Sequence, residues 1–176
     1  MRRKNVTNAI IRESITEALL LLMQVQPFAQ ITITDLVQKA GVSRVSFYRN
    51  FESKEDVLLF RLDETARSWW ASFPEEPENY LFGIFTHCLA LRDLIALLYR
   101  QGLAPLLWQN LRSLIGPADG DAPELAYKKA CLTGALFGLL SEWVRRGMTD
   151  SPEAMSALFD PKQVAAFVSE LDISLP

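Results

Sequence analysis

The sequence predicts an all-α protein, and three observations carry that prediction. Apolar residues recur every three or four positions, the spacing of one helix face, along almost all of the 176 residues. Two segments start with Thr or Ser followed three residues later by Asp, the pattern of a helix capping box. No convincing run alternates apolar and polar residues as a strand does. Apolar residues make up 49% of the chain, which is enough to build a core and excludes wholesale disorder.

Composition excludes several classes of function. No apolar run approaches the roughly 18 residues of a membrane span, and the N-terminus lacks the apolar core of a signal peptide. Cys88 and Cys131 lie far apart in apolar settings, so we expect two small core residues in a reducing cytoplasm. The single histidine, His87, and the lack of Cys/His pairs predict no metal or cofactor site. An enzyme would need His87 to meet a carboxylate and a Ser in a cleft, so we expect a non-enzyme with His87 in the core or a pocket wall.

The charges separate into two regions. Residues 1–54 carry 8 Lys and Arg against 4 Asp and Glu, whereas residues 55–176 carry 10 against 17. The formal charge of the whole chain is −3, so the total hides the basic character of the first region. A basic region on an acidic body predicts two domains, 1–54 and 55–176, of which the first suits a polyanionic partner.

The first region is predicted to begin with two helices. The first of them follows Thr7 as its cap and stops at Pro27. Thr32 and Asp35 form a capping box for a short second helix, and Gly41 suits the left-handed residue that would end it.

A further short helix over 44–50 takes Ser43 as its cap, and Ser53 with Asp56 opens a long helix that reaches about Trp70. Two short capped helices joined by a tight glycine turn, with a longer helix on either side, are the pattern of a helix-turn-helix. The basic residues 2–4 are expected either as an arm along a nucleic-acid backbone or as a disordered end.

Residues 55–176 are predicted to form a helical bundle. The prolines at 74 and 77 break the helical pattern, and residues 116–123 have the composition of a loop. The remaining helices are expected at 78–101 with a break near 91–93, at 103–115, at 124–147, and at 152–171 with a restart at Pro161.

The stretch ITITDLVQKAGVSRVSFYRNFESKEDVL, residues 31–58, closely resembles the DNA-binding domain of the TetR family of transcriptional regulators. The later stretch GLLSEWVRRGMTDSPEAM looks like the end of compact TetR-type C-terminal domains, including relatives of the regulators of dihydroxyacetone-kinase operons. The resemblance implies a homodimeric repressor that binds a palindromic double-stranded DNA operator. It also implies release by a small-molecule effector, with control by a protein partner as the alternative.

The resemblance, with the small polar face expected of the 44–50 helix, assigns eight residues to DNA: Thr32, Ser43, Arg44, Val45, Ser46, Tyr48, Asn50 and Lys54. Arg44, Val45 and Ser46 are expected at base edges in the major groove, and Tyr48, Asn50 and Lys54 at phosphates. Thr32 and Ser43 would be helix caps in any case, Tyr48 could instead pack on the first helix, and Arg44 could be solvated surface.

The second region is expected to hold an effector pocket and a dimer interface. The pocket residues proposed from their place on bundle helices are Phe85, Cys88, Tyr99, Trp108 and Tyr127. The interface is placed on the glycine-containing helix, at Gly134, Phe137, Gly138, Leu140 and Val144, together with residues 152–171. Ordinary packing within one chain is the alternative for the two glycines.

Overall fold

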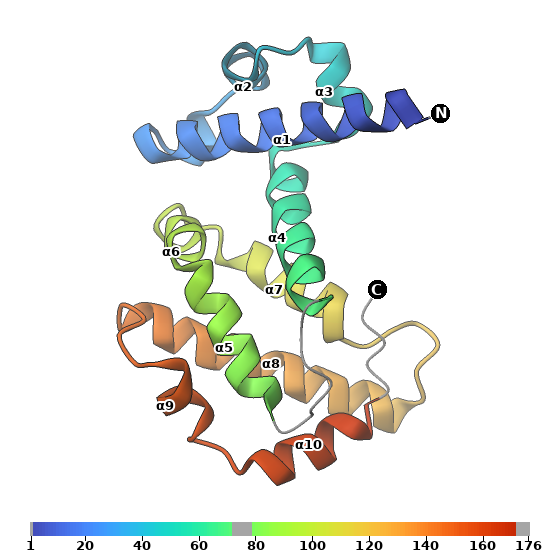
Figure 1. Cartoon of the computed structure of the whole chain (residues 1–176), viewed down its shortest axis with the longest axis vertical. Helices are drawn as coiled ribbons and strands as arrows, with labels where there is room; N and C mark the ends of the chain where they lie inside the picture. The colour runs from blue at the N-terminus through green and yellow to red at the C-terminus, as the bar shows by residue number, and fades with distance from the viewer. Residues whose placement is uncertain (1, 72–78, 172–176) are drawn as a thin grey trace.

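The computed structural model describes residues 2–71 and 79–171, and within these ranges all regular structure is helical (Figure 1). The all-α prediction is therefore confirmed. The elements are α1 (Arg2–Val25), η1 (Phe28–Gln30), α2 (Ile33–Ala40), α3 (Arg44–Asn50), α4 (Lys54–Trp70), α5 (Tyr80–Ala90), α6 (Arg92–Arg100), α7 (Ala104–Ile115), α8 (Pro123–Arg145), α9 (Pro152–Ser156) and α10 (Pro161–Ser169).

The molecule has a head and a body joined by one helix (Figure 1). The head comprises α1, η1, α2 and α3, and the body comprises α5 to α10. The joining helix, α4, packs on α1 at one end and on α7 at the other, while α7 packs on α8 and α5 on α9. A single hydrophobic core runs from Leu19 in the head through Leu62 of α4 to Trp143 in the body. The predicted domain boundary at residue 54 coincides with the first residue of this shared helix.

Side chains cap the short helices of the head as the sequence predicts. The Thr32 hydroxyl accepts from the Asp35 amide, and the Asp35 carboxylate accepts from the Thr32 amide, so the capping box is complete. Gly41 ends α2 at φ 67°, and Ser43 caps α3 by accepting from the Ser46 amide. Positive φ suits glycine because no Cβ opposes it.

Two details of the caps differ from the prediction. Thr7 is not a cap, because α1 begins at Arg2 and includes the backbone of the basic segment 2–4 in its first turn. Ser53 caps α4 by accepting from the Asp56 amide, but the Asp56 carboxylate accepts from the Glu52 amide instead of closing the box on Ser53.

The helices of the body begin and end close to the predicted positions, including the break between α5 and α6 and the restart at Pro161. The predicted break at Pro74 and Pro77 lies outside the described residues. After α8 the chain reverses at Gly147, with φ 79°, and the Met148 amide donates to the Trp143 carbonyl to close the turn. No single helix among the described residues is long and apolar enough to cross a membrane; α5 and α6 together pass that test but bend by 69° where they meet.

Candidate nucleic-acid interface and internal cavity

The side chains of α3 divide between the core and the surface. Phe47 is fully buried and its ring lies 6.1 Å from that of Phe51, which anchors the helix. Arg44, Val45 and Tyr48 are exposed on the other side, Val45 to 67% and Tyr48 to 54%. Tyr48 touches the edge of Phe47 and leaves most of its ring open to solvent. The helix therefore presents a cation, a methyl-bearing side chain and a phenol on one outward face.

The other predicted contacts of this segment also serve the fold. Ser43 Oγ lies 3.0 Å from both the amide and the hydroxyl of Ser46, and Asn50 Nδ2 donates to the Ser46 carbonyl at 2.8 Å. Thr32 Oγ1 donates to Asp35 Oδ2 at 2.6 Å. The hydrogen bonds from the Thr32 side chain and amide lower the pKa of Asp35, so this exposed carboxylate stays ionised. Any DNA contact by these side chains adds to their capping role.

Lys54 holds the head together from within. Its Nζ donates to the Phe28 carbonyl at 2.7 Å and to the Ile31 carbonyl at 2.6 Å, and it lies 4.3 Å from the centre of the Phe28 ring. These bonds fix η1 to the first turn of α4. No local sequence pattern signals this role of Lys54, because the two carbonyls precede it by more than 20 residues.

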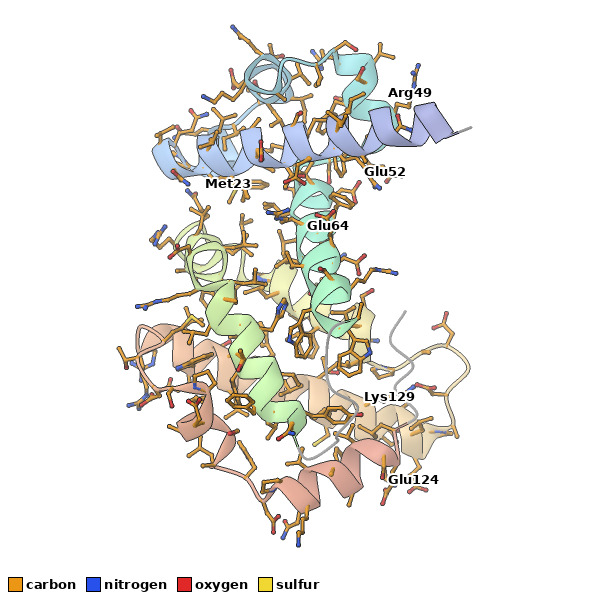
Figure 2. The ribbon with its side chains drawn as sticks, viewed as in Figure 1. Met23, Arg49, Glu52, Glu64, Glu124 and Lys129 are labelled. Carbon is orange, nitrogen blue, oxygen red and sulfur yellow. The ribbon has the colours of Figure 1, made fainter. Side chains whose placement is uncertain are left out.

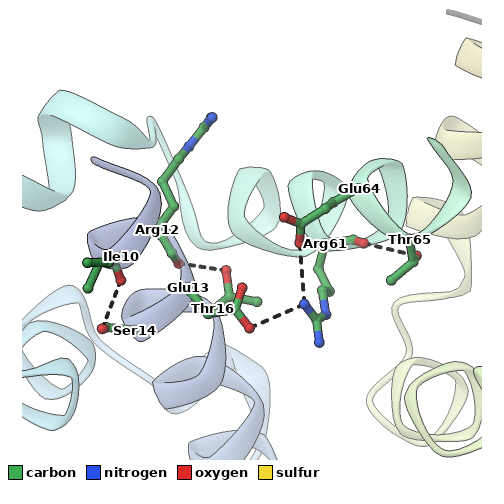
Figure 3. Close-up of polar contacts among 8 residues, drawn as sticks. All are labelled: Ile10, Arg12, Glu13, Ser14, Thr16, Arg61, Glu64 and Thr65. Carbon is green, nitrogen blue, oxygen red and sulfur yellow. Dashed lines mark hydrogen bonds and ion pairs between the residues drawn. The ribbon is translucent and has the colours of Figure 1, made fainter. Parts of the chain in front are cut away.

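Two arginines connect α1 with the start of α4. The guanidinium of Arg12 lies 4.2 Å from the ring centre of Phe60 and 5.2 Å from that of Phe51, and its buried Nε has no hydrogen-bond partner in the described part of the chain. Arg61 Nη1 contacts Glu13 of α1 and Glu64 of its own helix, each at 3.3 Å (Figure 3). Charged side chains thus reinforce the apolar contact between head and joining helix.

Gln101, at the end of α6, makes the polar contact between the body and the head. Its Oε1 accepts from the Phe28 amide at 2.9 Å, and its Nε2 donates to the carbonyls of Met23 at 2.7 Å and Gln26 at 3.3 Å. Figure 2 shows Met23 at the end of α1 that faces α6. Both backbone polar groups of Phe28 are therefore hydrogen-bonded to side chains: its N–H donates to Gln101, and its C=O accepts from Lys54.

A cavity of about 120 Å³ lies in the body beside α4. Its wall is mostly aliphatic and aromatic, from Leu62, Ala66, Arg67, Trp69, Trp70, Ile84, His87, Cys88, Leu91, Ile95, Leu107, Asn110, Leu111, Leu114, Ile115, Leu136 and Leu140. Trp69 stacks on His87 with 4.9 Å between ring centres. Burial lowers the pKa of His87 and raises that of Cys88 to about 12, so both side chains are uncharged at neutral pH.

Of the five predicted pocket residues, the structure places Cys88 in this wall and the other four elsewhere. Phe85 packs edge-on against Trp143, the Tyr99 hydroxyl pairs with Ser141 Oγ at 2.7 Å, Trp108 packs on Phe137, and Tyr127 is 76% exposed. Instead Trp69 and Trp70 enter the cavity from the far end of α4. Which face of a helix meets a cavity depends on tertiary packing, and helical spacing alone does not reveal it.

The predicted interface residues fall on two sides of α8. Gly134 and Gly138 are exposed, and a Cβ built on either would meet nothing within 4 Å among the described residues. Packing within one chain therefore does not explain these glycines. Leu140, by contrast, is 7% exposed and lines the cavity, whereas Phe137 and Val144 are half-buried.

The outward face of α8 is uncharged over its middle part. Its exposed residues between 127 and 138 are Tyr127, Ala130, Cys131, Gly134, Ala135 and Gly138. The expectation that Cys131 is a core residue is wrong, because its side chain belongs to this face. A broad uncharged strip on an exposed helix is typical of a surface that another helix covers.

Three comparisons relate this geometry to known proteins. Residues 15–59 match the model of the bacterial regulatory proteins of the tetR family. The chain is 48% identical over 58 residues to the HTH-type transcriptional regulator EthR of Mycolicibacterium smegmatis, and 50% identical over 42 residues to EthR of Mycobacterium tuberculosis. These matches cover 33% and 24% of the chain but only 27% and 19% of the two relatives.

A solved structure extends the likeness beyond the head. The TetR transcriptional regulator from Streptococcus agalactiae superposes with a TM-score of 0.59 at 20% identity, covering 95% of this chain and 98% of that one. At 20% identity the superposition shows that the two proteins share a fold, and this shared fold extends over both the head and the body. Over residues 15–59 the chain therefore matches the helix-turn-helix of the TetR family of bacterial regulatory proteins, and the chain as a whole has the fold of a TetR transcriptional regulator.

Proposed function

We propose that the protein represses transcription by binding a near-palindromic DNA operator as a homodimer, until a small-molecule effector releases it. The observation that carries the proposal is the exposed face of α3. Phe47 anchors that helix in the core while Arg44, Val45 and Tyr48 point outward. A helix with such a face fits the major groove of B-DNA, which is about 12 Å wide.

The outward residues divide by chemistry into base readers and phosphate contacts. Arg44 can donate two hydrogen bonds to guanine, and the Val45 methyls can pack on the thymine methyl, with Ser46 beside them. The phenol of Tyr48, the amide of Asn50 and the third N–H of the Lys54 ammonium suit phosphate oxygens. Thr32 and Ser43, at helix N-termini, suit phosphates as well.

Dimerisation is supported by the uncharged face of α8. Two copies related by a twofold axis would each cover the other's Gly134 and Gly138, which otherwise have open space above them. The second copy supplies a second recognition helix, and successive major grooves lie roughly 34–36 Å apart. Binding to chromosomal DNA places the protein in the cytoplasm.

The cavity beside α4 supports control by a small molecule. Its wall includes Ile95 of α6, the helix whose last turn leads to Gln101 and the head. An effector that favours one position of α6 would change operator affinity by a coupling energy of about 1–3 kcal/mol. A protein effector is the second candidate, favoured by the exposed Leu158 and Phe159 between α9 and α10.

The direct test is selection of bound sequences from a random pool of DNA duplexes, with the wild-type protein and with Arg44→Ala. We expect the wild type to enrich a palindrome, and the variant to lose preference at one position of each half-site, at a cost of about 1–3 kcal/mol. Arg100→Ala, which removes the same charge from an exposed position of the body, is the control. Failure to enrich any sequence would contradict the proposal, and a uniform loss would make Arg44 a phosphate contact.

A further inference from the structure

The part of the cavity wall that the structure describes carries no unbalanced charge. Among its described residues the one ionised side chain is Arg67, which is half exposed and whose Nε donates to Asp63 Oδ2 at 2.8 Å. His87 is half-buried against Trp69, and its burial favours the neutral imidazole. A charged ligand would lose its hydration on entering this cavity, and the described wall offers it no counter-ion that is not already paired.

Two polar side chains of the wall nevertheless have no hydrogen-bond partner among the described residues. Neither the imidazole of His87 nor the side-chain amide of Asn110 makes a hydrogen bond to any residue in the described ranges. They reach the cavity from different helices, α5 and α7, and stand in an otherwise apolar surface. Both side chains are only partly buried, so their hydrogen-bonding groups remain available to a ligand or to water between the two helices.

The size and shape of the cavity narrow the class of ligand further. A volume of about 120 Å³ is close to that of an apolar cavity of roughly 150 Å³ that admits benzene. Trp69 and Trp70 form an edge-to-face pair with 5.6 Å between ring centres, and aromatic walls favour aromatic guests. Trp69 and His87 also border an open groove whose lining includes Glu13, Arg61 and Glu64, so their stack stands between the cavity and solvent.

We infer that the cavity binds an uncharged molecule with one aromatic ring and one hydrogen-bonding group, which His87 and Asn110 orient against the two tryptophans. This inference rests on the proposed function, since it names the chemical class of the effector. The ligand titration described below is done without DNA, and the selection of operator DNA is done without ligand. Each experiment can therefore contradict its own proposal without affecting the other.

Four probes of similar size test the class: benzyl alcohol, toluene, benzoate and benzylammonium. Titration of the full-length protein is followed by NMR shifts of the tryptophan indole N–H signals. We expect benzyl alcohol to bind best and toluene about fivefold more weakly, the factor of one neutral hydrogen bond. Benzoate and benzylammonium should bind at least about tenfold more weakly than benzyl alcohol, because their charges stay unpaired.

Variants assign the contact. Asn110→Leu and His87→Phe keep the size of the wall, and at least one of them should abolish the preference for benzyl alcohol over toluene. Gln109→Leu, at the exposed neighbouring position of α7, is the matched control and should leave the preference unchanged. Leu111→Trp fills the cavity and should remove binding of all four probes; Ala66→Leu fills less of it and serves if the first variant does not fold.

Three results would overturn the inference. Benzoate or benzylammonium binding as tightly as benzyl alcohol would show that the site takes ions. A preference for benzyl alcohol that survives in both Asn110→Leu and His87→Phe would place the polar contact elsewhere. Absence of binding by every probe would show that the cavity does not take a single neutral ring.

Discussion

The head and the body of this protein are specified in different ways. In the head, side chains set the helix starts: Thr32 and Ser43 accept from backbone amides three residues ahead. In the body, the four helices α5 to α8 begin without any side-chain cap, and side chains cap the two short helices that follow, Ser151 on α9 and Asp160 on α10. Apolar packing among these helices, and against α4, fixes their positions instead. The surface of the head follows from its local sequence, whereas the cavity of the body exists only when distant helices meet.

The two regions also differ in what they leave exposed. On α3 the head exposes a cation and a phenol, Arg44 and Tyr48, which are complementary to a polyanion. On α8 the body exposes an uncharged strip around Gly134 and Gly138, which is complementary to another apolar surface. The comparison suggests one partner for each region: DNA for the head and a second copy of the chain for the body.

The largest expected effect comes from Gly138→Arg on the proposed dimer face. The new guanidinium would be stranded unpaired in an apolar seam twice per dimer, at a cost of several kcal/mol. We expect a monomer by light scattering, with the helical circular dichroism retained because the position is open in the single chain. Operator affinity should fall steeply. Gly120→Arg, in an open loop position, is the control.

Gly138→Ala, a smaller substitution at the same position, distinguishes packing within one chain from packing across a dimer as the reason for this glycine. In the single chain Gly138→Ala should stabilise α8 by about 1 kcal/mol, because alanine favours helix and its Cβ meets nothing within 4 Å. In a close-packed dimer the same methyl should weaken association. If Gly138→Ala is more stable and still fully dimeric, the interface does not include Gly138. A Gly138→Arg variant that remains dimeric would lead to the same conclusion.

The next effect is expected at Lys54, the residue that closes the head. Lys54→Met removes two charge-assisted hydrogen bonds, to the carbonyls of Phe28 and Ile31, and should lower the free energy of unfolding by about 1.5–3 kcal/mol. If the remaining N–H meets a phosphate, the slope of log affinity against log salt also falls by about 1. Urea unfolding and salt titrations of operator binding measure both, with Lys162→Met, exposed on α10, as control. Lower stability with an unchanged salt slope would make Lys54 purely structural.

The contrast between the regions explains how far sequence reasoning reaches. Caps and turns depend on residues three or four apart, so Thr32, Gly41 and Ser43 were predictable individually. Lys54 and Gln101 bond carbonyls more than 20 and more than 70 residues away, and no local pattern signals such partners. Trp69 and Trp70 carry no signal of the cavity either, because helical spacing does not say which of two apolar faces will border empty space.

Gln101 tests whether the regions communicate. Gln101→Leu removes the acceptor of the Phe28 amide and the donor to the Met23 carbonyl, and should lower stability by about 1 kcal/mol, because the site is partly open to water. The Phe28 amide should exchange faster with deuterium, and any ligand effect on operator affinity should shrink. Arg100→Leu, exposed one residue earlier, is the control. Unchanged exchange at Phe28 would mean that apolar contacts alone hold the joint.

The smallest effect is the response of stability to pH between about 5.5 and 7.5, where His87, the single histidine of the chain and part of the body, is the side chain expected to titrate. Burial lowers the pKa of His87 below its ordinary value of 6.5, so on acidification the unfolded chain takes up this proton before the folded chain does. Above pH 6.5 the imidazole is neutral in both states, so the protein keeps its full free energy of unfolding. As the pH falls from 6.5 toward the lowered pKa, the unfolded chain gains the proton first and the free energy of unfolding decreases. His87→Phe keeps a ring against Trp69 but cannot titrate, so urea unfolding between about pH 5.5 and 7.5 should show a flatter dependence than the wild type. Equal slopes for the two proteins would mean that His87 is as well hydrated in the folded chain as in the unfolded one, and its stack on Trp69 would then not separate the cavity from solvent.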